Sequence, residues 1–71
     1  MTIITVIDTE GKLPLCFGCE NFVIEGGVVR YWGGKVWNEY KLHKGDIVVI
    51  WQQGFPRRKL VVQELGQVVP L

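Results

Sequence analysis

The sequence predicts an all-β fold, a small barrel of five or six strands. Short runs of β-branched and aromatic residues alternate with turns that contain glycine. No long stretch has the 3.6-residue hydrophobic period of an amphipathic helix. The chain has 71 residues, of which 48% are hydrophobic and 21% charged. This length and composition predict a single globular domain, residues 1–71.

The first half of the chain divides into short runs separated by turns. A strand, a turn, an apolar segment and two further strands are expected at residues 2–8, 9–12, 13–19, 21–25 and 28–32. Pro14 places the start of the apolar segment at a sheet edge or entry point. Gly26 and Gly27 predict a hairpin between the last two strands, because glycine accepts the positive φ of a tight turn.

The second half begins at another glycine pair, Gly33 and Gly34. Residues 35–42 fit either a strand, with Val36 and Tyr40 on one face, or one helical turn. The remaining chain is expected to form a turn, a strand, a loop, a return strand and a closing segment at residues 43–46, 47–51, 52–58, 59–65 and 66–71. No longer helix is expected anywhere.

Residues 47–51, "IVVIW", are apolar on both faces of a strand. Such a strand belongs in the middle of a sheet or in a closed barrel. A barrel also removes the exposed edges along which a valine-rich chain would aggregate. We therefore expect an OB-like barrel, with an SH3-like barrel or an intertwined β dimer as alternatives.

Residues 34–64 carry a Gly-Lys pair, an aromatic stretch, "KGDIVVI", a loop and a final strand. This order resembles the second half of the OB fold in the translation initiation factor one and one-A family. The matching positions are Gly34, Lys35, Gly45, Asp46 and the strand 47–51. The resemblance implies an OB barrel and, through basic residues after Gly-Lys and on the barrel face, contact with ribosomal RNA. In this chain Val36, Trp37 and Asn38 stand where the family has those basic residues.

Catalytic and metal chemistry find little support in the sequence. Cys16 and Cys19 form a C-x-x-C pair, and His43 is the only further cysteine or histidine. A structural zinc site normally takes four such ligands, so we expect no metal in the monomer, although two chains could share one. The chain has no serine and no phosphate-binding glycine motif. We expect a non-enzymatic protein without a cofactor.

The charges and the aromatic rings gather in the middle of the chain. Residues 1–29 carry a balance of −3 and residues 30–59 a balance of +5, and six of the eight aromatic residues lie between 31 and 55. Rings beside cations are typical of single-stranded nucleic-acid sites, where bases stack and phosphates pair. The predicted RNA- or DNA-binding residues are Arg30, Tyr31, Trp32, Lys35, Trp37, Tyr40, Lys41, Arg57, Arg58 and Lys59.

The alternative is a small regulatory or protein-interaction module, of the kind encoded by viruses or plasmids, with an exposed tryptophan patch as its contact surface. Its partner would be another protein or a second copy of the chain. The N-terminus lacks a basic start, and the longest apolar run is too short to span a bilayer. We therefore expect a soluble cytoplasmic protein without a membrane partner.

Overall fold

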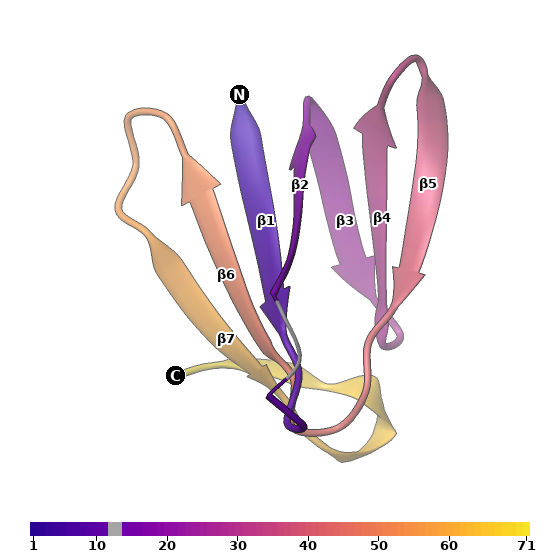
Figure 1. The fold of residues 1–71 in the computed structure, drawn as a ribbon, viewed down its shortest axis with the longest axis vertical. Helices are drawn as coiled ribbons and strands as arrows, with labels where there is room; N and C mark the ends of the chain where they lie inside the picture. The colour runs from indigo at the N-terminus through magenta and orange to yellow at the C-terminus, as the bar shows by residue number, and fades with distance from the viewer. Residues whose placement is uncertain (12–13) are drawn as a thin grey trace.

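The computed structural model describes residues 1–11 and 14–71 and contains eight strands and one 3₁₀ turn (Figure 1). The elements are β1 (Thr2–Ile7), β2 (Leu15–Cys19), β3 (Asn21–Glu25), β4 (Val28–Gly33), β5 (Val36–Lys41), β6 (Ile47–Gln52), β7 (Arg58–Val62), η1 (Glu64–Gly66) and β8 (Val68–Pro70). The longest helical segment in the described part of the chain is thus a three-residue turn.

The strands form two antiparallel sheets. The first sheet has the order β2-β1-β6-β7-β8, and the second has the order β3-β4-β5. Only Glu20 separates β2 from β3, and its backbone N–H donates to the carbonyl of Trp32 at 2.9 Å. The chain therefore passes from one sheet into the other at Glu20.

The all-β prediction is confirmed, because the described elements are strands apart from the 3₁₀ turn. The pairings found among the described residues give two sheets and not a closed barrel. β5 is an edge of the second sheet and β8 an edge of the first, and no pairing joins them in the described chain. The OB-like barrel therefore stays a prediction.

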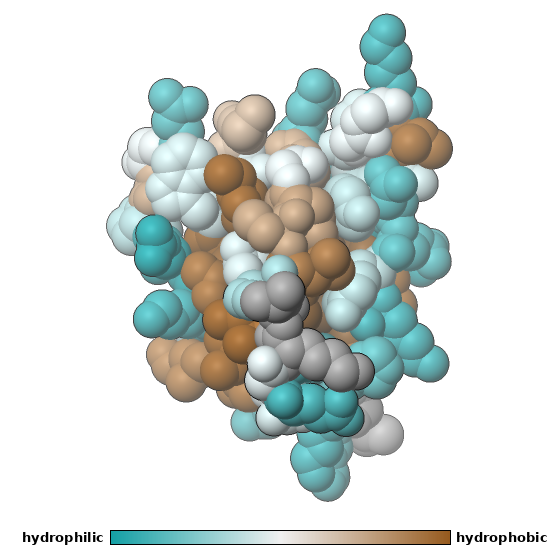
Figure 2. Space-filling model, viewed as in Figure 1, coloured by the Kyte–Doolittle hydropathy of each residue, from teal (hydrophilic) through white to brown (hydrophobic). Residues whose placement is uncertain are grey.

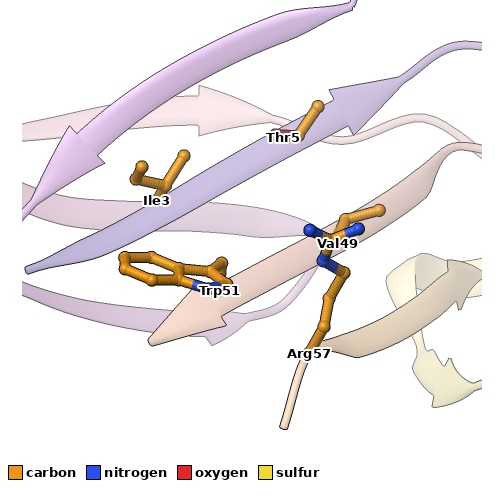
Figure 3. Close-up of a pocket in the computed structure, with 5 residues that line it drawn as sticks. All are labelled: Ile3, Thr5, Val49, Trp51 and Arg57. Carbon is orange, nitrogen blue, oxygen red and sulfur yellow. The ribbon is translucent and has the colours of Figure 1, made fainter. Parts of the chain in front are cut away.

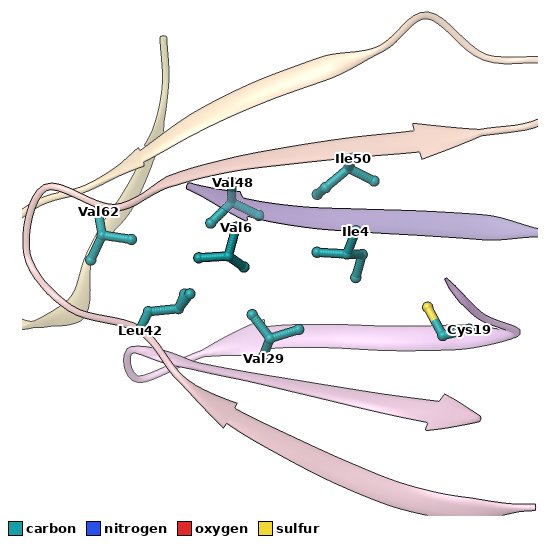
Figure 4. Packing of buried hydrophobic residues seen from close by; sticks show 8 residues of the cluster. All are labelled: Ile4, Val6, Cys19, Val29, Leu42, Val48, Ile50 and Val62. Carbon is teal, nitrogen blue, oxygen red and sulfur yellow. The ribbon is translucent and has the colours of Figure 1, made fainter. Parts of the chain in front are cut away.

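The core lies between the two sheets (Figure 4). Alternate residues of each strand point inward, as the two-residue period of a strand requires. The first sheet and the loops and strands opposite it contribute Ile4, Val6, Cys19, Val29, Leu42, Val48, Ile50 and Val62. Partly buried rings, among them Phe17, Phe22 and Tyr31, extend this core toward its rim.

One open alternative is decided, and three element predictions need correction. Residues 35–42 hold the strand β5, and the helical turn lies at 64–66 instead. The return strand ends at Val62 rather than at residue 65. The closing segment contains a further strand, β8, because Val62 pairs with Val68 and Val61 with Val69. The described residues form eight strands rather than five or six, since the apolar segment, residues 35–42 and the closing segment each hold one: β2, β5 and β8.

In the chain that the structure describes, no helix has the length and apolar character needed to cross a membrane.

Candidate functional site

The predicted binding residues lie on two different sheets. Seven of them belong to the second sheet or its β4–β5 turn: Arg30, Tyr31, Trp32, Lys35, Trp37, Tyr40 and Lys41. Arg58 and Lys59 begin β7 in the first sheet, and Arg57 directly precedes them. The structure therefore divides the predicted residues between two sheets, and nucleic-acid binding by them stays a prediction. The two groups are separated where the chain returns from the second sheet to the first, at residues 42–46 between β5 and β6.

Two of the predicted rings face the core. Tyr31 stacks on Phe17 with ring centroids 4.1 Å apart and planes inclined by 20°. Tyr40 lies beside the same Phe17 at 6.5 Å. Trp32, the next residue after Tyr31, points to the outer face, as strand alternation predicts. Tyr31 and Tyr40 therefore help to pack the second sheet against the first.

The outer face of the second sheet is balanced in charge. Arg30 donates from Nε to Glu39 Oε1 at 3.2 Å, and the two residues are opposite one another in the β4–β5 ladder. Lys41 lies opposite Val28, which in turn lies opposite Glu25. Each of the two cations on these strands thus has a carboxylate in its own cross-strand row. This arrangement lowers the attraction of the face for phosphates.

A tryptophan pair occupies the next row of the same face. Trp32 and Trp37 are cross-strand partners, with ring centroids 5.6 Å apart and planes inclined by 63°. Trp37 is 51% exposed. Both rings line a pocket together with Glu20 and Asn21, which we call the Trp32–Trp37 pocket.

The outer face of the first sheet carries a second pocket (Figure 3). It is lined by Ile3 and Thr5 of β1, Val49 and Trp51 of β6, and Arg57. The register places Ile3 opposite Trp51 and Thr5 opposite Val49, so the strand residues form a small flat patch. The Arg57 side chain extends over this patch toward β6 (Figure 3). We call this surface the Trp51 patch.

The surroundings of the Trp51 patch are apolar or cationic. Lys59 lies opposite Val49 in the β6–β7 ladder. In the described strands of the first sheet, no aspartate or glutamate occupies an outward-facing position. Figure 2 shows hydrophobic surface over β1 and β6 and hydrophilic surface beside the start of β7. Arg57 and Lys59 therefore face a surface without a carboxylate on its strands.

The hairpin beside the patch is held by a side-chain bond. Arg58 donates from Nη2 to Gln52 Oε1 at 3.1 Å, across the loop that joins β6 to β7. Phe55, in this loop, is 68% exposed. The loop thus presents another ring near the cations at the start of β7.

Trp51 was absent from the predicted site residues, although the sequence held a signal for it. Ile47, Val49 and Trp51 share one face of a strand whose other face holds Val48 and Ile50. Only one of these faces enters the core, so the other had to be exposed or covered by a partner. The structure places Val48 and Ile50 inside and leaves Trp51 37% exposed.

The two cysteines lie on opposite faces of β2, because Cys16 is exposed and Cys19 is buried. Burial raises the pKa of the Cys19 thiol, against a smaller opposing effect of the N-terminal ammonium group. One ion could not bind both sulfur atoms while β2 keeps its place in the sheet. In the part of the chain that is described, no three His, Cys, Asp or Glu side chains gather as a metal site.

His43 belongs to a structural turn. Its backbone N–H donates to Oδ2 of the buried Asp46 at 2.9 Å, and its Nδ1 lies 3.9 Å from the same oxygen. The Asp46 backbone carbonyl also accepts from Val62 N–H. These bonds attach the turn before β6 to the end of β7.

No protein-family model, curated protein or solved structure matches this chain. The resemblance to the initiation-factor family stays a prediction.

Proposed function

We propose that the protein is a non-enzymatic single-strand nucleic-acid-binding protein, and that the Trp51 patch is its binding surface. A base would stack on the exposed Trp51 ring, and phosphates would pair with Arg57 and Lys59. The observation that carries the proposal is the shared pocket of Trp51 and Arg57 on a sheet face whose described strands carry no outward carboxylate.

The ring supplies the sequence-independent part of the binding. Trp51 lies on a rigid central strand, because β6 is paired with β1 on one side and β7 on the other. Its cross-strand neighbour Ile3 provides apolar surface beside it. Stacking of one base on such a ring contributes roughly 1–3 kcal/mol. A ring held by the sheet loses little conformational freedom when the base binds.

The cations supply the electrostatic part. Arg57 lines the pocket, and Lys59 lies one strand away opposite Val49. Phosphate pairing releases counterions from the strand, so affinity falls as salt rises. The logarithm of the affinity falls with the logarithm of the salt concentration, with a slope of about −0.7 for each neutralised phosphate. If Arg57 and Lys59 each pair with a phosphate, the affinity should show a small but measurable dependence on salt concentration.

The test is fluorescence anisotropy of labelled twelve-nucleotide dT and rU strands between low and physiological salt. We expect Trp51→Ala to weaken binding about 5- to 150-fold, which corresponds to the loss of roughly 1–3 kcal/mol of stacking. Arg57→Glu is expected to weaken binding and flatten the salt slope. Trp37→Ala, on the other sheet, is the matched control and should leave binding unchanged.

Two outcomes would contradict the proposal. One is a folded wild-type protein that does not raise the anisotropy of either strand at low salt. The other is a Trp51→Ala variant that binds as tightly as the wild type while Trp37→Ala is weakened, which would place the contact on the second sheet.

A protein-interaction module is the second candidate, and the same sheet face supports it. Its further outward positions are apolar: Ile7, Ile47, Val61 and Val69. A partner protein or a second copy could cover this surface by hydrophobic contact. Such an interface would weaken little as salt rises, and sedimentation would show a complex or a dimer without nucleic acid.

We also keep the OB-like barrel as part of the proposal, because a curved sheet with a cationic and aromatic face is how such barrels bind single strands. Closure would require pairing between the free edges of β5 and the first sheet. Nuclear Overhauser contacts between backbone protons of β5 and β8 in solution would support closure, and their absence would leave a two-sheet sandwich.

The cytoplasm is the compartment we propose. The free thiols of Cys16 and Cys19 suit a reducing environment, in which they stay unpaired.

A further inference from the structure

We propose that the Trp32–Trp37 pocket binds a trimethylammonium group. This site is separate from the Trp51 patch, lies on the other sheet, and does not depend on the proposed nucleic-acid binding. Its four lining residues are Glu20, Asn21, Trp32 and Trp37.

The rings form two walls of the pocket. Trp32 and Trp37 lie side by side on β4 and β5, and the inclination of 63° between their planes makes an open corner. Both rings line the same pocket, so both are available to a group bound there. The π face of an aromatic ring attracts a cation, and tryptophan attracts it most strongly.

Glu20 supplies the charge. It is the corner residue between β2 and β3, and its backbone N–H donates to the Trp32 carbonyl at 2.9 Å. This bond attaches the corner to β4, and Glu20 lines the same pocket as the Trp32 and Trp37 rings. Asn21 completes the row, because it lies opposite Trp32 on β3. A carboxylate next to two rings attracts cations and repels phosphates.

Among the described residues no ion pair joins Glu20 to a cation, and Met1, at the N-terminus, lines a neighbouring pocket together with Glu20. Arg30, one row away, is paired with Glu39 at 3.2 Å. Lys35 lies in the β4–β5 turn and is exposed. The pocket therefore presents its carboxylate to an incoming ligand.

The hairpin that carries the rings is rigid. Gly34 and Lys35 both have φ of 65°, as a type I′ turn requires, and this turn joins β4 to β5 tightly. Asn38 Nδ2 donates to the carbonyls of Gly33 at 3.2 Å and of Val36 at 3.1 Å. The two tryptophans are thus held in position before a ligand arrives, which lowers the entropic cost of binding.

The chemistry favours a methylated cation over a simple ammonium group. A primary ammonium is strongly hydrated and donates three hydrogen bonds, which this pocket meets with one carboxylate and one amide. A trimethylammonium group has no donors to satisfy, and its methyl surface packs on the rings. Its sources are a trimethylated lysine side chain or a choline headgroup.

The test follows the indole N–H signals of the protein in two-dimensional nuclear magnetic resonance spectra. Choline is titrated against its neutral isostere 3,3-dimethylbutan-1-ol, which has the same shape without the charge. We expect choline to shift the Trp32 and Trp37 signals in a saturable way and the isostere to bind at least fivefold more weakly. The Trp51 signal is the internal control, because Trp51 lies on the other sheet and should not move.

Two variants sharpen the result. Glu20→Gln keeps the shape of the pocket and should weaken choline binding at least threefold, whereas Glu25→Gln, elsewhere on the same face, should leave it unchanged. Trp37→Ala should abolish the shift of Trp32. Three results would each overturn the proposal. They are equal binding of choline and its isostere, a Glu20→Gln variant that binds choline as tightly as the wild type, and the absence of a saturable shift.

The two sources are distinguished in the same assay. N-acetyl-trimethyllysine amide and phosphocholine are titrated separately. Because Glu20 repels a phosphate, we expect trimethyllysine to bind more tightly. Tighter binding of phosphocholine would assign the pocket to a choline headgroup and overturn the lysine source.

Discussion

Gly66 shows how one residue fixes the end of this fold. It ends η1 with φ of 75°, and a Cβ atom added there would lie 2.8 Å from both the Cα and the N of Gly27. Gly27 belongs to the β3–β4 turn and also has a positive φ, of 75°. The 3₁₀ turn therefore touches a turn of the other sheet backbone to backbone, which only two glycines allow.

The first prediction compares two glycines. Gly66→Ala should lower the free energy of unfolding by about 3 kcal/mol, because positive φ costs alanine about 1–2 kcal/mol and the clash with Gly27 adds a further overpacking cost. Gly54→Ala should cost only about 1–2 kcal/mol, since Gly54 has φ of 86° but no heavy atom within 4 Å of an added Cβ. Urea unfolding of both variants measures the difference. Equal losses would show that the two turns do not press on each other.

For Trp51 and Tyr31, the exposure of the ring in the structure differs from what the neighbouring residues in the sequence suggest. Tyr31 sits between charged and aromatic neighbours in the sequence, yet its ring stacks on Phe17 at 4.1 Å. Trp51 ends the most apolar run of the chain, yet it is 37% exposed. Strand alternation shows that neighbours point in opposite directions, but it does not show which direction leads into the core.

At the scale of the elements, the β4–β5 hairpin settles the ambiguity of residues 35–42. The segment pairs with β4 along its whole length, from Val36 opposite Gly33 to Lys41 opposite Val28. One helical turn, the alternative for this segment, would lack these cross-strand hydrogen bonds. Lys35 is the only residue other than glycine with a positive φ among the described residues.

The second prediction concerns this turn. Lys35→Asn should keep or raise the free energy of unfolding by up to about 1 kcal/mol, because asparagine tolerates the left-handed region better than lysine. Lys35→Val should lower the free energy of unfolding by about 1 kcal/mol, since a β-branched side chain is disfavoured there. Thermal unfolding followed by circular dichroism measures both changes. A more stable valine variant would mean that Lys35 does not hold φ of 65° in solution.

The bent segment that contains β2 and β3 connects the two sheets. Its turn at Glu20 lets one strand pair with β1 before the corner and with β4 after it. The same corner places Glu20 beside Trp32, so the element that joins the sheets also builds the proposed cation pocket.

At the scale of the whole molecule, the core is small. Eight hydrophobic residues are buried among the described positions. A domain of this length is expected to have roughly 4–10 kcal/mol of stability. The loss of one well-packed side chain therefore removes a large fraction of it.

The third prediction compares two neighbours on β1. Ile4 is fully buried, and Ile4→Ala should cost about 2–5 kcal/mol through lost burial and the cavity left behind. Ile3 faces outward beside Trp51, and Ile3→Ala should cost about 1 kcal/mol. Equilibrium unfolding in urea, with tryptophan fluorescence as the signal, measures both. If Ile3→Ala lowered the free energy of unfolding as much as Ile4→Ala, a partner would have to cover the outer face of the first sheet.

The local pattern of the sequence was sufficient for much of the fold. The glycine pairs located the two hairpins at Gly26-Gly27 and at the start of β5, and the β-branched runs located β1, β3, β4 and β6 within a residue or two. These features are local, because positive φ and strand propensity depend on a few adjacent residues. The short strand β8 has too few residues for such a signal, and it forms only because β7 offers it an edge.

The position of the candidate sites was decided by the tertiary structure. The sequence placed cations and rings close together in the chain, but pairing determined which of them share a face. Arg30 meets Glu39 only through the β4–β5 register, and Arg57 meets Trp51 only through the β6–β7 hairpin. Glu20 joins Trp32 and Trp37 only because the chain turns there from one sheet to the other. Local sequence sets what each strand can be, whereas non-local pairing sets which side chains meet.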